Sequence, residues 1–183
     1  MRRPVTSRRV YTGRHISLRL DELEFPNRHR VVYEIVEHRG AAAMVALTGD
    51  RRLLLVRQFR PAVGEELLEI PAGTIEEGET PEACARRELA EEVGHAAGRW
   101  ERLISYYPSP GVLSEQLHVF LAQDLHPAPA PREEEDLRVE SLPLADAYRR
   151  IAAGEIRDAK SIIGITAAWE RFEGRSKADR SVE

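Results

Sequence analysis

Three glutamates of this chain, Glu88, Glu91 and Glu92, stand close enough in sequence for their carboxylates to act together. On a helix they would occupy positions i, i+3 and i+4 and share one face, where like charges repel by roughly 0.2–0.5 kcal/mol per pair. A bound cation would relieve that repulsion. Carboxylate oxygens are hard ligands that suit Mg²⁺ or Mn²⁺, ions that also hold phosphate oxygens. The pattern indicates a metal site for phosphate chemistry, and its alternative is a solvated acidic helix face.

The segment that carries these glutamates has start and stop signals for a helix. Thr80 is a good N-cap, and Pro81 suits the first helical position. Gly94 suits the left-handed conformation that commonly follows a helix. The sequence therefore predicts one helix from Pro81 to Val93.

The glutamates belong to a larger set of residues at fixed distances along the chain: Gly73, Glu79, Arg87, Glu88, Leu89, Glu91, Glu92 and Gly94. This set resembles the Nudix box, Gly-x5-Glu-x7-Arg-Glu-hydrophobic-x-Glu-Glu-x-Gly-hydrophobic. The one departure is His95, where the family usually has an aliphatic residue, and it questions local packing more than metal binding. The resemblance implies an α/β fold, a Nudix-type α/β/α sandwich with a mixed sheet and a β-rich N-terminal extension.

The same resemblance implies which residues hold metal. Glu88 and Glu92, with the carbonyl of Ala72, are expected to bind Mg²⁺, for which Mn²⁺ can substitute. Glu91 is expected to supply a further carboxylate, for another ion or for an activated water, so two or three ions are expected. Three residues are expected to support this geometry: Gly73, Glu79 and Arg87.

Further segments resemble the ADP-ribose pyrophosphatase branch of Nudix hydrolases. They are Tyr33–His38, Val56–Pro61 and Glu69–Gly73, and Pro110 stands fifteen places after His95, as is typical of that branch. Taken alone, Pro110 would fit an ordinary Ser-Pro-Gly turn. The resemblance implies a small-molecule nucleotide sugar, ADP-ribose, as substrate, cleaved to AMP and ribose 5-phosphate.

Four residues are expected to contact the substrate by this resemblance. Arg60 is expected to grip phosphate oxygens, since a guanidinium can bind them bidentately, and the alternative is a surface arginine. Tyr33 aligns with an aromatic residue that stacks on adenine, and core packing is its alternative. Thr74 and Ser109 match positions that touch the ligand in relatives, Ser109 across a dimer interface, and either could be a turn residue.

An acidic run, Glu133–Asp136, follows the proline-rich stretch from His126 to Arg132. Related pyrophosphatases carry an acidic pair on a loop in this region, which helps to position or deprotonate the attacking water. Glu135 is the best match for that catalytic role and Glu133 its companion, with a register uncertain by one or two places. The alternative is a charged, solvated loop.

Length and composition fit a single soluble enzyme domain, with 183 residues, 42% of them hydrophobic. The net charge of −4 argues against nucleic acid as a partner. The single cysteine, Cys84, forms no internal disulfide and is expected to pack in the core. The chain shows no secretory h-region and no 18-residue apolar span, so we expect no membrane partner and a cytoplasmic location.

The chain is expected to divide into residues 1–40, a β-rich segment for dimerisation and substrate binding, and residues 41–183, the Nudix hydrolase domain. A homodimer is expected because the first forty residues are too few to bury a core alone, and because the resemblance is to pyrophosphatases whose N-terminal strands complete a partner's site. Hydrophobic patterning predicts strands and helices along the chain. The strands are Val10–Leu20, Val31–Val36, Ala41–Leu47, Leu53–Val56, Leu67–Ile70, Leu117–Leu121 and Val139–Leu142, and the later helices are Leu144–Ala153 and Ser161–Phe172.

Two other functions stay open. One is hydrolysis of another nucleoside diphosphate sugar, such as ADP-glucose or GDP-mannose, by the same metal chemistry. The other is a catalytically silent ADP-ribose sensor. Such sensors usually have an eroded box or an attached DNA-binding domain, and this sequence shows neither.

Overall fold

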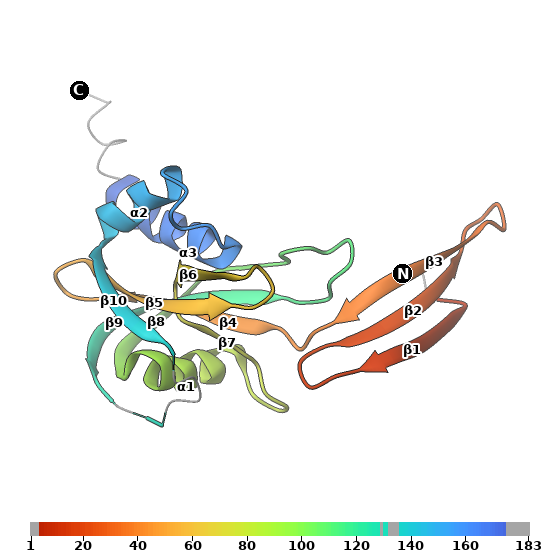
Figure 1. The fold of residues 1–183 in the computed structure, drawn as a ribbon, viewed down its shortest axis with the longest axis horizontal. Coiled ribbons are helices and arrows are strands. Elements are labelled where there is room, and N and C mark those ends of the chain that lie inside the picture. Colours follow the sequence, from red (N-terminus) through yellow and green to blue (C-terminus); the bar gives the residue numbers. More distant parts are fainter. Residues whose placement is uncertain (1–3, 129, 132–135, 175–183) are drawn as a thin grey trace. The chain divides into compact units, whose positions relative to one another are not determined.

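Two β-sheets organise the chain in the computed structural model, which describes residues 4–128, 130–131 and 136–174 (Figure 1). One sheet belongs to an N-terminal unit made of Met1–Gly40 and Tyr106–Leu117. The other belongs to a sandwich unit made of Ala41–Ser105 and His118–Glu183. No helix in the described ranges is long and apolar enough to cross a membrane.

The N-terminal unit is a three-stranded antiparallel sheet in the order β1-β2-β3. Its strands are β1 (Thr6–Thr12), β2 (Ser17–Glu24) and β3 (Arg30–Glu37). A turn closed by the Gly13 N–H on the Ile16 carbonyl, at 2.8 Å, separates β1 from β2, so the stretch predicted as one piece is two strands. The Val36 N–H donates to the Val112 carbonyl at 2.8 Å, which ties the second segment of this unit to β3.

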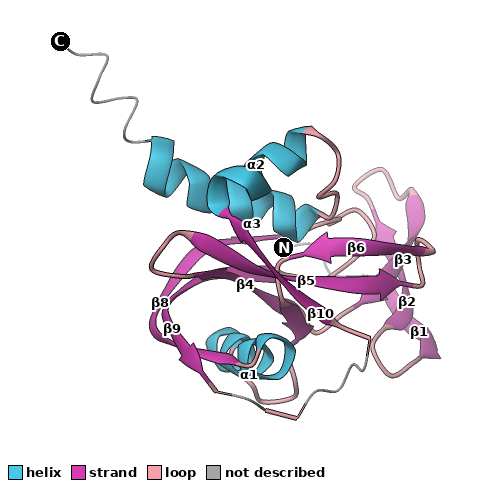
Figure 2. Cartoon of the chain, turned by 60° about the vertical axis from the view of Figure 1, so that its left-hand side comes forward, coloured by secondary structure: helices cyan, strands magenta, loops and turns pink. Residues whose placement is uncertain are grey.

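The sandwich unit contains a seven-stranded sheet in the order β10-β5-β4-β9-β8, with β6 paired to β5 and β7 paired to β4. Helix α1 covers one face of this sheet, and helices α2 and α3 cover the other (Figure 2). The strands are β4 (Ala41–Leu47), β5 (Arg52–Arg60), β6 (Glu65–Glu69), β7 (Ala72–Thr74), β8 (His95–Tyr106), β9 (Leu117–Pro127) and β10 (Arg138–Pro143).

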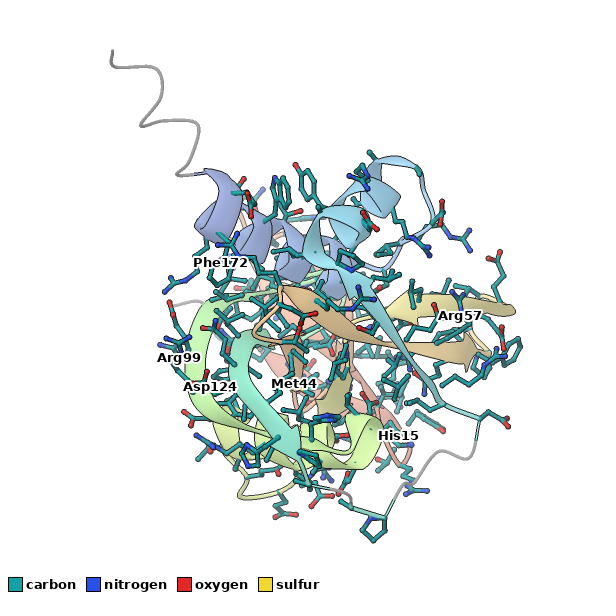
Figure 3. All side chains as sticks on the ribbon, turned by 90° about the vertical axis from the view of Figure 1, so that its left-hand side faces the viewer. His15, Met44, Arg57, Arg99, Asp124 and Phe172 are labelled. Carbon is teal, nitrogen blue, oxygen red and sulfur yellow. The ribbon has the colours of Figure 1, made fainter. Side chains whose placement is uncertain are left out.

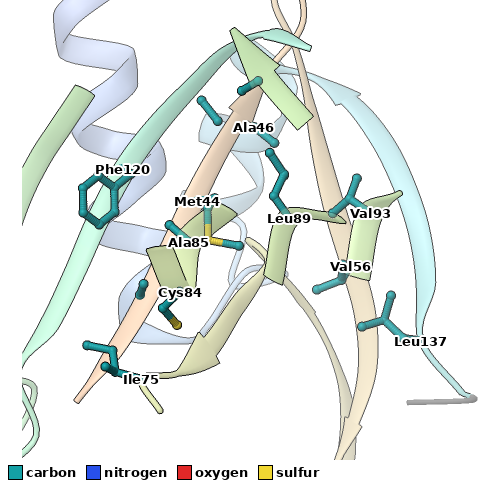
Figure 4. Close-up of a cluster of buried hydrophobic side chains, with 13 residues drawn as sticks. Met44, Ala46, Val56, Ile75, Cys84, Ala85, Leu89, Val93, Phe120 and Leu137 are labelled. Carbon is teal, nitrogen blue, oxygen red and sulfur yellow. The ribbon is translucent and has the colours of Figure 1, made fainter. Parts of the chain in front are cut away.

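Helix α1 (Pro81–Val93) packs its apolar side on the sheet through a buried cluster (Figure 4). Met44 of β4 lies fully buried in this cluster, and Leu89 of α1 is also fully buried (Figures 3 and 4). Burying a side chain of this size contributes about 1.5–3 kcal/mol. The helix is thus fixed on the sheet by one side, while its glutamates lie on the half-exposed remainder.

Helix α3 (Ala159–Trp169) lies close against the other face because Gly164 has no side chain. A Cβ built on Gly164 would lie 2.9 Å from Ile70 and 3.1 Å from Val45. A π-helical turn, Glu170–Gly174, continues α3. Helix α2 (Leu144–Ala152) packs beside α3 through the stacked rings of Tyr148 and Trp169, whose centroids are 4.9 Å apart.

The described elements differ from the predicted ones mainly in the strands. Strand β8 was not predicted, because charged residues such as Arg99 and Glu101 interrupt its apolar positions and much of it is exposed. Strand β9 extends to Pro127, well past the apolar run that predicted it. The helix predicted over Ser161–Phe172 begins two residues earlier, since the Asp158 carboxylate caps its first turn by accepting from the Ser161 N–H.

Candidate active site

The glutamates at positions 88, 91 and 92 lie on α1, whose ends are the predicted ones. The Thr80 hydroxyl accepts a hydrogen bond from the Ala83 N–H at 3.2 Å, and Pro81 occupies the first turn. Gly94 ends the helix with φ 71° in the left-handed region. The caps fix where the helix begins and ends. Burial of Leu89 and Val93 fixes the rotation of the helix about its axis, and therefore the direction in which its acidic side faces.

Arg87 connects the acidic residues of the site. Its Nη1 donates to Glu88 Oε1 at 2.7 Å and to Glu91 Oε2 at 3.1 Å, while Nε donates to Glu79 Oε1 at 3.0 Å. Its Nη2 also reaches the carbonyl of Thr74 at 3.3 Å. One guanidinium thus compensates three carboxylates and ties α1 to the segment before it.

The ionisation of this cluster follows from these contacts. The hydrogen bond from Arg87 is the main cause that lowers the pKa of Glu79, with a smaller contribution from the Glu76 backbone N–H. The same hydrogen bond raises the pKa of Arg87, which therefore stays charged. Burial raises the pKa of the Cys84 thiol to about 12, so Cys84 is protonated and suits the packing role expected for it.

Strand β7 passes close to two glutamates of the helix. The Ala72 N–H donates to Glu92 Oε2 at 2.9 Å. A Cβ built on Gly73 would lie only 1.8 Å from Glu88 Oε1, so no residue with a side chain fits while Glu88 keeps this position. The backbone at Ala72 and Gly73 is thereby brought beside the carboxylates of Glu88 and Glu92.

This donor set fits a small, hard cation. Mg²⁺ is typically bound through one or two carboxylates together with waters and substrate phosphates, rather than in a cage made wholly of protein groups. Within the part of the chain that the structure describes, no three acidic, histidine or cysteine side chains are arranged to hold an ion by themselves. The carboxylates of Glu88 and Glu92 lie beside the backbone of Ala72 and Gly73, and hard oxygen donors of this kind are what such an ion prefers.

Arg60 lies at the end of β5 and contacts a buried carboxylate. Its Nε donates to Glu69 Oε1 at 2.9 Å and its Nη2 to Glu69 Oε2 at 2.7 Å. The Glu69 side chain is 1% exposed, whereas that of Arg60 is 37% exposed. Arg60 is therefore held in one orientation at the surface of the sheet, a feature that the sequence did not reveal.

The remaining predicted site residues lie in three places. Thr74 lies on β7, in the sandwich unit with the box residues. Tyr33, on β3, and Ser109 both belong to the N-terminal unit, where the Ser109 carbonyl accepts from the Leu113 N–H at 2.9 Å in a turn. Glu133 and Glu135 lie outside the described residues.

Sequence reasoning missed the role of Glu69 and its second cation, Lys160. Lys160 Nζ contacts Glu69 Oε2, although the two residues are ninety-one positions apart in sequence. Burial by itself would raise the pKa of Glu69, but hydrogen bonds and charge from Arg60 and Lys160 outweigh burial and lower it. A charged residue within the apolar run Leu67–Ile70 was the available signal, because a buried charge needs partners.

A concave region of the sandwich unit away from the box, with a volume of about 190 Å³, has its charged groups already paired. Arg99 of β8 and Asp124 of β9 lie side by side there, with 3.9 Å between Arg99 Nε and Asp124 Oδ2 (Figure 3). Arg51 pairs with Glu173 and lies over the ring of Phe172. These internal pairs account for the charged groups of that region, so the box remains the candidate active site.

Comparison with known proteins identifies the family of this chain. The model of the NUDIX domain family matches residues 37–163, which is more than half of the 183-residue chain. This chain belongs to the Nudix family. The match contains every residue of the box and also reaches Lys160 and Ser161 of α3 in this Nudix domain.

Relatives of this Nudix chain cover most of its length. It is 37% identical over 164 residues to an ADP-ribose pyrophosphatase of Bacillus subtilis (strain 168), which covers 88% of this chain and 89% of that protein. It is 36% identical over 148 residues to a GDP-mannose pyrophosphatase of Escherichia coli (strain K12), covering 71% and 77% of the two chains.

A solved structure described as an ADP compounds hydrolase is similar to the whole Nudix chain. The TM-score is 0.83 with 26% sequence identity, and the match covers 97% of this chain and 98% of the other. The predicted fold class, a Nudix-type α/β/α sandwich with a β-rich N-terminal extension, is confirmed.

Proposed function

We propose that this protein is a divalent-metal-dependent ADP-ribose pyrophosphatase, which hydrolyses the diphosphate of ADP-ribose to AMP and ribose 5-phosphate. The observation that carries the proposal is the packing of β7 against α1, where Gly73 leaves room only for the Glu88 carboxylate and Ala72 bonds to Glu92. The similarity to the Bacillus subtilis ADP-ribose pyrophosphatase, over 88% of the chain, supports the choice of substrate.

We assign the metal to Glu88, Glu92 and the carbonyl of Ala72, with Glu91 as a further carboxylate for two or three ions. Mg²⁺ is the expected ion, and Mn²⁺ can replace it. Bound there, the ions would neutralise charge on the diphosphate and lower the pKa of a coordinated water. Arg87 would hold Glu88 and Glu91 in place, because its guanidinium donates hydrogen bonds to both carboxylates. Glu79 would in turn hold Arg87 by accepting a further hydrogen bond from it.

The other predicted site residues would bind the substrate and accept a proton from the attacking water. Arg60 would hold a phosphate oxygen in both the ground state and the transition state. Tyr33 would stack on adenine, and Thr74 and Ser109 would contact the ligand. Two further residues, which precede β10 and lie outside the described residues, are assigned to activation of the attacking water: Glu135, with Glu133 as its companion.

The assembly proposed for the enzyme is a homodimer in which the N-terminal strands complete the substrate site. Large apolar side chains of the N-terminal unit are exposed, including Tyr11 at 57% and Val32 at 57%, as is common on surfaces that bind a partner. The cytoplasmic location expected from the sequence is also a proposal, which cell fractionation can test.

A GDP-mannose pyrophosphatase is the alternative favoured by a specific observation, the 36% identity to the Escherichia coli protein of that name. Both activities would use the same metal chemistry, so the base and the sugar decide between them. A silent ADP-ribose sensor is disfavoured because every residue of the box up to Gly94 is present and Arg87 forms hydrogen bonds to both Glu88 and Glu91.

The test is product analysis with purified protein across ADP-ribose, ADP-glucose and GDP-mannose, each with Mg²⁺ and with EDTA. Anion-exchange chromatography should show AMP and ribose 5-phosphate from ADP-ribose at the highest kcat/KM, and no products with EDTA. Faster release of GMP from GDP-mannose would establish the alternative. Tight calorimetric binding of ADP-ribose without turnover would identify a sensor.

A further inference from the structure

Glu69, at the end of β6, is a buried carboxylate held by two cations from distant parts of the chain. Its side chain is 1% exposed. Both of its oxygens accept from Arg60, and Oε2 also contacts Lys160 Nζ. Burying an ion costs several kcal/mol unless its partners compensate it, so two cations around one carboxylate fix its position as well as its charge.

The bonds from Glu69 determine how Arg60 is presented. Two parallel hydrogen bonds, from Nε at 2.9 Å and Nη2 at 2.7 Å, fix the plane of the guanidinium. The Arg60 side chain nevertheless remains 37% exposed. A guanidinium held along one edge by a carboxylate is pre-organised to bind an anion, since less conformational entropy is lost on binding.

Lys160 connects this pair to the first turn of α3. Its Nζ also donates to Asp158 Oδ2 at 2.9 Å, and the Lys160 side chain is 13% exposed. Asp158 caps the helix by accepting from the Ser161 N–H at 3.1 Å. The fully buried Ser161 hydroxyl accepts from the Ile70 N–H at 2.7 Å, so α3 holds both the side chain of Glu69 and the backbone next to it.

We propose that Lys160 is a positioning residue for substrate binding, which acts through Glu69 to orient Arg60 towards the diphosphate. This inference rests on the function proposed above. Without Lys160, the carboxylate of Glu69 would be bonded to Arg60 alone. The carboxylate and the guanidinium could then rotate together. Arg60 would then lose more conformational entropy when it binds phosphate, because Glu69 would no longer hold it in one orientation beforehand.

A double-mutant cycle with Lys160→Met and Arg60→Ala tests this chain of contacts. Steady-state kinetics with ADP-ribose and Mg²⁺ should show KM of Lys160→Met raised about tenfold, in the range of one charge-assisted hydrogen bond, with kcat close to wild type. In the Arg60→Ala background, Lys160→Met should raise KM no further, because the residue through which it acts is absent. Lys160→Arg, which keeps the cation, should recover most of the affinity.

A matched control and a second variant guard against a purely structural effect. Arg157→Gln removes a cation from the same segment whose partner, Glu65, is exposed, and should leave KM and kcat unchanged. If Lys160→Met does not fold, Asp158→Asn carries the test. Asparagine caps a helix as well as aspartate does, but it takes away the charge that holds Lys160, so KM should rise and kcat should not.

Two results would overturn the inference. One is an unchanged KM in a folded Lys160→Met or Asp158→Asn enzyme. The other is a rise in KM caused by Lys160→Met that is as large in the Arg60→Ala background as in wild type. Additive effects of this kind would mean that Lys160 does not act through Arg60. Both results concern Lys160 alone and leave the proposed function standing, whereas failure of the wild-type protein to hydrolyse ADP-ribose with Mg²⁺ would remove the proposed function and this inference with it.

Discussion

Gly73 is required for space rather than for backbone freedom, because its φ lies outside the left-handed region while a Cβ would lie 1.8 Å from Glu88 Oε1. The atoms met are the far end of a flexible glutamate, so a side chain at position 73 could be accommodated if Glu88 moved. A small displacement of a residue that aligns reacting groups can cost about a hundredfold in rate. Position 73 therefore couples local packing directly to the proposed metal site.

We predict that Gly73→Ala keeps the fold and loses most of its activity. Its thermal midpoint should stay close to that of wild type, while ADP-ribose turnover at saturating Mg²⁺ falls about a hundredfold. Gly49→Ala is the matched control, since a Cβ there meets nothing within 4 Å. Equal turnover in the two variants would show that Glu88 need not occupy its observed position.

Glu69 predicts a specific pH dependence of stability. Its pKa is lowered in the folded protein, so below the unfolded pKa, about 4.3, the unfolded chain binds more protons than the folded one. The stabilising contribution is therefore complete above that pH and is lost as pH falls through the folded pKa. The free energy of unfolding of Glu69→Gln, from urea titrations between pH 3 and 6, should change less with pH than that of wild type. Parallel curves would contradict this assignment.

At the scale of elements, α1 was predictable because all its signals are local. Thr80, Pro81 and Gly94 act within one turn of the helix ends, and the structure gives the predicted bounds. Strand β8 was not predictable in the same way. It is held in the sheet by pairing with β9, which is not a local signal. Charged residues such as Arg99 also interrupt the alternation of apolar and polar residues that marks a strand.

The cap of α1 gives a stability prediction. Thr80→Ala should lower the free energy of unfolding by about 1 kcal/mol, because the Ala83 N–H loses its side-chain acceptor. Thr80→Ser should retain the hydrogen bond and most of the stability. Urea denaturation of both variants provides the comparison, and a Thr80→Ala protein as stable as Thr80→Ser would mean that water replaces the cap without cost.

Across the whole molecule, the sequence predicted which residues form the box but not which distant residues hold Arg60 in place. The box lies on one helix and the strand before it, so spacing alone brings Glu88 and Glu92 to the same place. The contact of Glu69 with Lys160 joins residues ninety-one positions apart and depends on how α3 packs on the sheet. Tertiary pairing of this kind leaves no periodic signal in the sequence.

The N-terminal unit predicts an effect of truncation. Deletion of residues 1–40 should disrupt the proposed homodimer and weaken ADP-ribose affinity, and it removes the Val36 backbone groups that bond to Val112 and Ser114. Light scattering and calorimetry on the full-length and truncated proteins measure both effects. A monomeric truncation with full activity would contradict the proposed assembly and leave the box chemistry intact.

The most direct test of the central claim, that the box carboxylates hold the metal that hydrolyses ADP-ribose, is AMP release by Glu92→Gln against wild type at saturating Mg²⁺. The amide nearly preserves shape but lacks the charge that a hard cation needs, so turnover should fall by orders of magnitude, with the thermal midpoint little changed. Glu88→Gln should behave alike. Near-normal Mg²⁺-dependent AMP release by either folded variant would contradict the account.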